Sequence, residues 1–106
     1  MVSQFDVYWV DLNPTIGAEM QKTRPCVVVS PQELNDHLDT VIIVPITSAI
    51  HGYPYRVGCH IMGRVGEIAT DQIRTIDKRR LKNRITMLSD DEIIVLQDVL
   101  RQMFCE

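Results

Sequence analysis

The sequence predicts a mainly β fold with one C-terminal helix, arranged as a small, strongly bent antiparallel sheet or partly open barrel. Three observations lead to this expectation. Short apolar runs rich in β-branched residues recur as far as Thr70, turn-forming residues separate them, and helical spacing begins only near the C-terminus. A length of 106 residues is that of one domain, so we expect a single domain over residues 1–106.

Each expected strand is a short apolar or alternating run bounded by turn signals. In chain order these are Val7–Val10, Cys26–Val29, Val41–Val44, Tyr55–Ile61, Gly66–Ala69 and Arg84–Leu88. The runs VVV (27–29) and VIIV (41–44) contain no polar residue, which indicates central strands buried on both faces. The stretch VYWVD (7–11) is more amphipathic.

Two helices are expected. Ser89 and Glu92 form a capping-box pattern, and apolar residues then recur at helical spacing, so we expect a helix from about Asp90 to Phe104 that packs one face on the sheet. The apolar positions are Ile93, Leu96, Val99, Leu100 and Met103. A shorter helix is expected after Ser30, with Ser30 as its N-cap and Pro31 as its first helical residue.

Composition bounds the class of protein. The chain is 45% hydrophobic and 24% charged, as in foldable globular domains. Its three cysteines (Cys26, Cys59 and Cys105) show no CxxC spacing, which argues against a disulfide framework and a zinc knuckle and fits reduced thiols in the cytoplasm. The N-terminus lacks a signal-peptide pattern, and the longest aliphatic run, VIIVPI (41–46), is too short to span a bilayer. We therefore expect a cytoplasmic protein without a membrane partner.

A basic segment stands out in a chain of net charge -3. Six of the eleven Lys and Arg residues fall between positions 74 and 84: Arg74, Lys78, Arg79, Arg80, Lys82 and Arg84. Such a patch on an acidic protein can bind a polyanion while the overall charge discourages indiscriminate binding. A solvated charged turn before a strand explains the same pattern equally well.

The loop from Gly17 to Pro25 ends in an arginine whose backbone is restricted. Because the residue before proline is disfavoured in the α region, Arg24 is held extended at the start of a strand, where its planar guanidinium can contact a phosphate at two points. An ordinary ion pair at the strand end is the alternative.

A second polar cluster follows the most apolar strand. Thr47 and Ser48 end that strand, and hydroxyls in this position can donate to a phosphate oxygen. Tyr53 and Arg56 follow, and an aromatic ring beside an arginine can stack on unpaired bases. Closure of a turn and loop packing are the alternatives.

We expect neither a metal nor a cofactor. Cys59 and His60 are adjacent and would point to opposite faces of a strand, and there is no carboxylate cluster, glycine-rich phosphate loop or GxSxG elbow. Hydrolysis would then require neither a metal nor a covalent serine. RNA permits such chemistry, because its own 2′-hydroxyl can attack the neighbouring phosphate.

Five motifs together resemble a known family. They are VYWVDLNPTIGAE, TRPCVVVS, VPITS, GYPYRV and DQIRTIDKRRL. In order and at matching separations they are similar to the MazF/PemK family of toxins from bacterial type II toxin-antitoxin modules. The resemblance covers nearly the whole chain and weakens only around residues 35–40 and in the C-terminal helix.

The resemblance implies a small SH3-like β-barrel of the CcdB/PemK/MazF type that forms a homodimer. It implies an mRNA interferase, an endoribonuclease that cleaves single-stranded RNA at a short sequence without a metal. The 2′-hydroxyl would be the nucleophile, leaving a 2′,3′-cyclic phosphate and a 5′-hydroxyl. The implied partner is a cognate MazE-like antitoxin whose disordered tail lies across the RNA groove, with DNA contacted only indirectly through the antitoxin complex.

The family's motifs also imply site residues. The Arg of its RP motif is Arg24, assigned chiefly to transition-state stabilisation, and the Thr of its PxTS motif is Thr47, which would hold a non-bridging phosphate oxygen. The acid of its DQ motif is Asp71, either general base or base-edge reader. The remaining expected RNA-binding residues are Gln21, Lys22, Thr23, Ser48, Tyr53, Arg56, Gln72 and Arg74.

The chain departs from the PemK-like pattern at two positions. The Arg that those members carry two residues before the acid is Ala69 here, and the His that some place after the early glycine is Ala18. A mechanism that depends on that Arg-Asp-His set therefore does not transfer intact.

Two other functions compete with the nuclease. One is a CcdB-like toxin that poisons DNA gyrase through its C-terminal helix and cleaves nothing, since VLRQMFCE is loosely similar to the aromatic helix of such toxins. The other is an inactive RNA-binding module.

Overall fold

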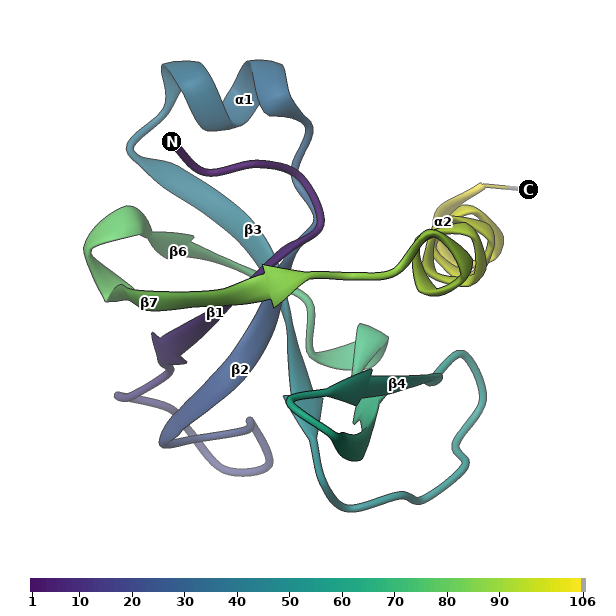
Figure 1. Ribbon diagram of the computed structural model, residues 1–106. Helices are drawn as coiled ribbons and strands as arrows, with labels where there is room; N and C mark the ends of the chain where they lie inside the picture. The colour runs from purple at the N-terminus through teal and green to yellow at the C-terminus, as the bar shows by residue number, and fades with distance from the viewer. Residues whose placement is uncertain (106) are drawn as a thin grey trace.

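The computed structural model describes residues 1–105 and consists mainly of short strands followed by one long helix (Figure 1). The strands are β1 (Asp6–Asp11), β2 (Thr23–Val28), β3 (Thr40–Thr47), β4 (Val57–Ile61), β5 (Arg64–Ile68), β6 (Arg74–Asp77) and β7 (Leu81–Met87). The helices are α1 (Gln32–His37) and α2 (Asp90–Phe104), with 3-10 turns η1 (Thr70–Gln72) and η2 (Lys78–Arg80). The predicted mainly β fold with a C-terminal helix is confirmed.

All strand pairs are antiparallel, in the order β4-β5-β3-β2-β1-β7, with β6 added beside β3. One edge of β3 serves two partners, because its first half pairs with β6 and its last residues, Ile46 and Thr47, pair with β5. A strand shared in this way must bend the sheet, and Figure 1 shows β7 crossing in front of the other strands. The prediction of a bent sheet that closes partway into a barrel is confirmed.

The core has two parts, one on each face of β2 and β3. Val27 and Val44 belong to the first cluster, and their neighbours Cys26 and Ile43 belong to the second. All four are 0% exposed, as expected of central strands with apolar residues on both faces. The first cluster includes Val57, Ile61 and Ile68 from β4 and β5, together with Leu96 from α2.

Helix α2 begins as the sequence predicts. Ser89 Oγ accepts a hydrogen bond from Glu92 N, and the Glu92 side chain accepts one from Ser89 N. Glu92 Oε2 also accepts from His60 N at 2.8 Å, which fixes the first turn of the helix to β4. Figure 1 shows α2 beside β4, viewed almost along its axis. In the described part of the chain, neither helix is long and apolar enough to cross a membrane.

Several strand boundaries differ from prediction. Strand β4 begins at Val57 and not at Tyr55, because Tyr55 has a φ of 66° in a turn. Strands β5 and β7 begin earlier than expected, at Arg64 and Leu81. Strand β6 was missed, because its sequence RTID carries a single buried apolar side chain, Ile76, and so lacks an apolar run.

The short helix α1 is confirmed, but its expected cap is wrong. Pro31 occupies the N-cap position and the helix begins at Gln32. Ser30 is instead buried, where its hydroxyl donates to Asn35 Oδ1 and accepts from Ile42 N. Ser30 therefore ties α1 to β3 and does not cap the helix.

Gly66 is needed where β5 approaches β3. A methyl group at this position would lie 3.0 Å from Ile46 Cγ2 and 3.3 Å from the carbonyl oxygen of Thr47. We expect Gly66→Ala to lower the free energy of unfolding by about 1–3 kcal/mol, because the extra atom forces the two strands apart. Thermal and urea unfolding followed by circular dichroism would measure the loss.

The matched control is Gly58→Ala in β4, where an added methyl group meets nothing within 4 Å. This variant should keep the stability of the original protein. Equal losses in the two variants would mean that the close approach of β5 to β3 is not the cause.

Candidate active site

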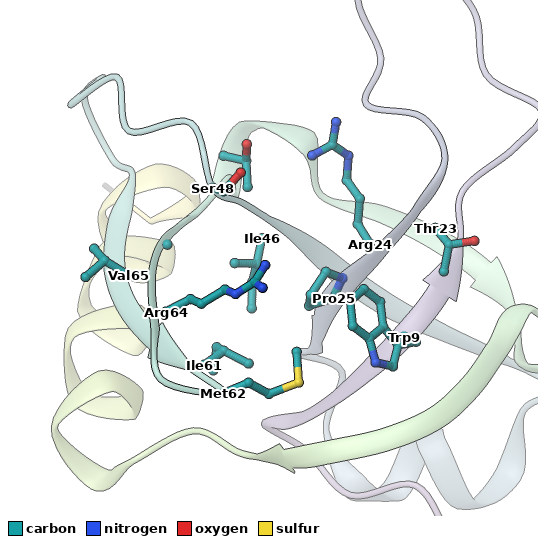
Figure 2. A pocket seen from close by; sticks show the side chains of 12 residues that line it. Trp9, Thr23, Arg24, Pro25, Ile46, Ser48, Ile61, Met62, Arg64 and Val65 are labelled. Atoms are coloured by element: carbon teal, nitrogen blue, oxygen red, sulfur yellow. The ribbon is translucent and has the colours of Figure 1, made fainter.

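A cavity of about 220 Å³ lies where β1, β2, β3, and the β4–β5 hairpin meet (Figure 2). Its lining combines an apolar floor with polar and cationic side chains. The lining residues are Trp9, Thr23, Arg24, Pro25, Ile46, Thr47, Ser48, Ile61, Met62, Arg64, Val65 and Gly66. Figure 2 shows Arg24 and Ser48 at one rim, with Ile61 and Met62 at the opposite end and with Pro25 and Trp9 along the side below Arg24.

Pairing of β2 with β3 brings the two expected catalytic residues together. The register joins Cys26 to Pro45, and its continuation by two residues places Arg24 opposite Thr47. Both line the cavity although they are far apart in sequence. The two motifs do not by themselves place Arg24 beside Thr47. The register of β2 against β3 does.

Hydrogen bonds orient both side chains. Arg24 Nε donates to the carbonyl of Gln21 at 3.0 Å. This bond uses only Nε, so the N–H groups on the two Nη atoms can donate to a ligand. Thr47 is 5% exposed, and its Oγ1 accepts from Ala49 N at 3.1 Å. A hydroxyl that accepts one bond still has its own proton to donate. The pair therefore presents several hydrogen-bond donors at the rim of one cavity, as an anionic group requires.

Of the residues that line this cavity, the sequence analysis named only Thr23, Arg24, Thr47 and Ser48 as site residues. Those it missed include Trp9, Met62 and Arg64. Trp9 pairs with Pro25 in the sheet, so its ring lies beside the start of β2. Met62 and Arg64 belong to the β4–β5 hairpin, which only folding brings to β2. Trp9 is the single tryptophan of the chain and lies in the amphipathic run VYWVD, and this was the one signal for it in the sequence. In the structure its side chain is half-buried.

The β4–β5 hairpin has the tightest common form. Ile61 pairs with Arg64, so only Met62 and Gly63 form the loop, with φ angles of 54° and 73°. Two successive positive φ values are typical of a type I′ turn, in which Asn-Gly is the favoured pair. Methionine in the first position is strained, and strained residues gather at ligand sites.

A second hollow, of about 240 Å³, contains the DQ motif. Asp71 and Gln72 line it together with Arg74 and residues of the β1–β2 loop. Gln72 Oε1 accepts from Met20 N at 3.2 Å, and Arg74 Nη1 donates to the carbonyl of Leu12 at 3.2 Å. Asp71 thus lines a different hollow from the one that holds Arg24 and Thr47.

Arg56 is enclosed by two carboxylates. Its side chain is only 6% exposed, with Nη1 3.0 Å from Glu67 Oε1 and with Nε and Nη2 bonded to the two oxygens of Asp71. Glu67 also accepts from Gly52 N at 3.0 Å, so the cluster fixes the loop between β3 and β4. The guanidinium carbon lies 5.0 Å from the ring centre of Tyr53. The structure therefore uses Arg56 to hold this loop in place.

These contacts set the ionisation of both acids. The hydrogen bonds from Arg56 hold the pKa of Asp71 below its ordinary value of 3.8. Burial alone would raise the pKa of Glu67, but hydrogen bonds from Gly52 N, Arg56 and His51 N outweigh it, so that pKa is lowered as well. Both groups are thus anionic at neutral pH, and Asp71 is a weak base there.

Of the other expected RNA-binding residues, Thr23 and Ser48 line the first cavity, whereas Gln21, Lys22 and Tyr53 line neither hollow. Gln21, Lys22 and Thr23 are exposed at the end of the β1–β2 loop, and Ser48 is exposed just after β3. Tyr53 is 54% exposed and stacks on His51, with ring centres 4.8 Å apart and an interplanar angle of 11°. Its stacked ring remains accessible from solvent.

Much of the basic segment serves the fold. Arg84 forms an ion pair with buried Asp6 at 3.1 Å, and Arg79 pairs with Asp77 at 3.0 Å. The other contacts run to backbone carbonyls: Arg74 to Leu12, Lys78 to Asn35, and Arg80 to Asn13. Of the two explanations for this cluster, the charged turn therefore accounts for most of it.

Two of the cysteine thiols are unreactive in this fold. Burial raises the pKa of Cys26 to about 12 and that of Cys59 to about 11. Within residues 1–105, no three His, Cys, Asp or Glu side chains gather closely enough to hold a metal ion.

Comparisons with known proteins agree in sequence and in fold. A profile for the PemK-like, MazF-like toxins of type II toxin-antitoxin systems matches residues 3–104. Endoribonuclease MazF of Staphylococcus epidermidis is 32% identical over 108 residues, covering 94% of this chain and 88% of that protein.

Solved structures share the fold. MazF from Deinococcus radiodurans superposes with a TM-score of 0.87 at 24% identity, over 99% of this chain and 97% of that one. An endoribonuclease in complex with its cognate antitoxin, from a mycobacterial species, has a TM-score of 0.81 at 20% identity, over 96% and 93% of the two chains.

We expect Arg56→Met to lower the free energy of unfolding by about 3–5 kcal/mol at pH 7, because it leaves the buried carboxylate of Glu67 without its cation. Both acids have lowered pKa values in the folded state, so the contribution of the cluster is present above the ordinary glutamate value of 4.5 and is lost as the pH falls through the lowered values. Urea unfolding at pH 7 and pH 3 should therefore show a smaller difference from the original protein at pH 3.

Arg79→Met is the matched control. Its ion pair with Asp77 has the same 3.0 Å separation as the Arg56–Glu67 pair, but the Arg79 side chain is 90% exposed. Removal of an exposed pair should change stability little. A difference for Arg56→Met that is as large at pH 3 as at pH 7 would contradict the electrostatic assignment.

Proposed function

We propose, from the premise that this chain belongs to the PemK-like, MazF-like toxin family of type II toxin-antitoxin systems, that its cavity rim cleaves single-stranded RNA. As a member of that family the protein is an endoribonuclease toxin. One observation carries the assignment of the site: the β2–β3 register brings Arg24 and Thr47 to the rim of one cavity.

The chemistry follows from the donors at this rim. The 2′-hydroxyl of the RNA loses its proton to solvent as O2′ bonds to phosphorus. The bond from phosphorus to O5′ then breaks, and the leaving O5′ takes up a proton from solvent. Arg24 stabilises the negative charge that develops on the phosphoryl oxygens. Thr47 donates a hydrogen bond to a non-bridging oxygen, and Ser48 assists Thr47. The products are a 2′,3′-cyclic phosphate and a 5′-hydroxyl.

The reaction so described needs no metal, because a guanidinium and a hydroxyl act where a metal would otherwise stabilise charge. Arginine suits this role, since it stays protonated and its fork matches two oxygens of one phosphate.

Asp71 is better placed to read RNA or to hold the site than to act as the general base. Its two oxygens accept hydrogen bonds from Arg56, and its lowered pKa weakens it as a base. Gln72 and Arg74 in the same hollow are proposed to border the RNA path. Gln21, Lys22, Thr23 and Tyr53 are proposed to line it on the outer loops, while Arg56 acts by positioning the loop between β3 and β4.

The proposed assembly is a homodimer in the cytoplasm that is neutralised by a MazE-like antitoxin, with DNA contacted only through that complex. Exposed apolar side chains on α2 support a protein partner, since Ile94 and Phe104 are both 64% exposed. A mycobacterial endoribonuclease with the same fold has been solved with its cognate antitoxin. The antitoxin's disordered tail is proposed to cover the RNA groove.

Incubation of the purified protein with a long single-stranded RNA in EDTA, followed by mapping of the ends, tests the proposed function. We expect cleavage with 2′,3′-cyclic phosphate and 5′-hydroxyl ends. Intact RNA at high protein concentration would overturn the nuclease mechanism. Inhibition of gyrase supercoiling without RNA cleavage would instead favour the CcdB-like alternative, and RNA binding alone would favour an inactive module.

Arg24→Ala should reduce the cleavage rate by about 10²-fold or more, because it removes charge stabilisation from the transition state. Arg24→Lys should recover only part of the rate, since an ammonium group lacks the two-point fork. Single-turnover cleavage of one oligonucleotide measures both. Lys82→Ala is the control for charge and should weaken binding only modestly. An Arg24→Ala rate equal to that of the original protein would refute the role.

Asp71→Asn separates the two possible roles of this acid. If Asp71 positions or reads RNA, the single-turnover rate on a saturating substrate should stay within about 10-fold of the original, whereas loss of a general base costs roughly 10²- to 10⁴-fold. The pH dependence of the rate is the second measurement. Loss of its acidic limb in the variant would establish Asp71 as the base.

A further inference from the structure

We propose that the cavity beside Arg24 and Thr47 binds one unpaired guanine base of the RNA, and that Arg64 recognises the edge of that base. The inference rests on the proposed nuclease function and extends it, because it names what the apolar part of the site is for. Neither the chemistry at Arg24 nor that at Thr47 requires an apolar floor.

The size and lining of the cavity suit a flat heterocycle. Its volume of about 220 Å³ is below the roughly 300–1,000 Å³ of pockets that enclose drug-sized ligands, so it fits a group the size of a single base. The floor is apolar, and its members are Trp9, Pro25, Ile46, Ile61 and Met62. Unpaired bases are commonly bound by stacking on aromatic and apolar side chains, and Trp9 offers the largest such surface here.

Arg64 supplies the polar group that such a pocket needs. It is exposed on β5 and forms no ion pair within residues 1–105, in contrast to Arg56 and Arg84. Figure 2 shows its side chain extending from β5 into the cavity toward Pro25 and Trp9. A free guanidinium pointing into an apolar pocket is ready to bind an acceptor of the ligand.

The geometry of a guanidinium selects among the bases. Its parallel N–H groups match O6 and N7 of guanine, which are two acceptors on one edge. On this edge adenine presents an amino group in place of O6, so one donor would face another, and the pyrimidines have no N7. Cytosine has two adjacent acceptors only on its Watson–Crick edge, at O2 and N3, so selection of guanine requires that Arg64 meet the edge that carries N7. A two-point contact of this kind is worth roughly 10- to 100-fold in discrimination between bases.

The hairpin supports a ligand site independently of Arg64. Met62 keeps a left-handed conformation with φ of 54°, although asparagine fits the first position of this turn better. The strained residue places a long apolar side chain on the cavity wall, where asparagine would not provide one. Strain retained at such a position fits a binding role better than a structural one.

The position relative to the cleavage chemistry completes the argument. Arg24 and Thr47 line the same cavity as Arg64, so a base held there belongs to a nucleotide next to the phosphate at the rim. Binding of that base would fix which phosphate is cut. The cavity therefore selects the cleavage site, while the rim performs the reaction.

The first test is cleavage of a randomised single-stranded RNA library, with sequencing of the ends. The original protein should require guanine at one position beside the cut. Arg64→Gln should lose that preference by roughly 10- to 100-fold and favour adenine, because an amide pairs with N6 and N7 of adenine. Lys82→Gln removes an equal charge outside the cavity and should keep the preference for guanine.

The second test measures binding without cleavage. Trp9 is the only tryptophan in the chain, so its fluorescence reports directly on the cavity. An oligonucleotide with a 2′-deoxy sugar at the cut cannot react, and the guanine version should quench Trp9 more strongly than the adenine version. Arg64→Gln should abolish the difference, and thermal unfolding should show that this variant is folded.

Met62→Asn distinguishes a binding role of Met62 from a purely structural one, because it is measured both by stability and by base preference. It relieves strain in the turn, so it should raise the melting temperature while it weakens the preference for guanine.

The outcomes separate the inference from the proposed function. RNA cleavage with no preference for guanine, or with a preference that Arg64→Gln leaves intact, overturns the base pocket and leaves the nuclease standing. Selective quenching by the guanine oligonucleotide without RNA cleavage supports the pocket and refutes the nuclease. Quenching by an antitoxin peptide but by neither oligonucleotide also overturns the inference.

Discussion

The antiparallel pairing of β2 with β3 is the constraint on which the rest of the molecule depends. It joins Cys26 to Pro45 and so carries Arg24 and Thr47 to the same end of the sheet. The pairing is itself enforced by burial, because both strands have apolar residues on both faces and contribute to both core clusters. A slip of one residue would exchange the two faces and move both side chains away from the cavity. The site is therefore as stable as the core that sets the register.

A ribonuclease site that contains carboxylates must hold them in a way that does not repel the anionic substrate. Glu67 and Asp71 both remain charged at neutral pH near the proposed RNA path. Arg56 lies between them, and its contacts with both acids reduce the net local charge. The same cluster holds the backbone of His51 and Gly52, so charge balance and loop position are provided by one group of side chains.

Part of this structure could be predicted from the sequence. Helix α2 has a local capping signal at Ser89, and β2 and β3 contain apolar runs that predict buried strands without knowledge of their partners. Strand β6 could not be found in this way, because it is defined by pairing with β3 and buries only Ile76. Arg24 and Thr47 were found through motifs, whereas the base pocket was not, since its walls come from strands that only the curled sheet brings together. Arg56 was expected to contact RNA on the basis of its residue type. In the structure its guanidinium instead contacts Glu67 and Asp71, two acids that are distant from it in the sequence.

The β4–β5 hairpin carries Met62 in its two-residue loop and Arg64 at the start of β5, whereas Arg24 and Thr47 belong to the central strands. Exchange of residues in that loop leaves the core and its register untouched. In the proposed site, substitutions at this one hairpin would therefore alter base preference while the residues that cut stay in place on the central strands.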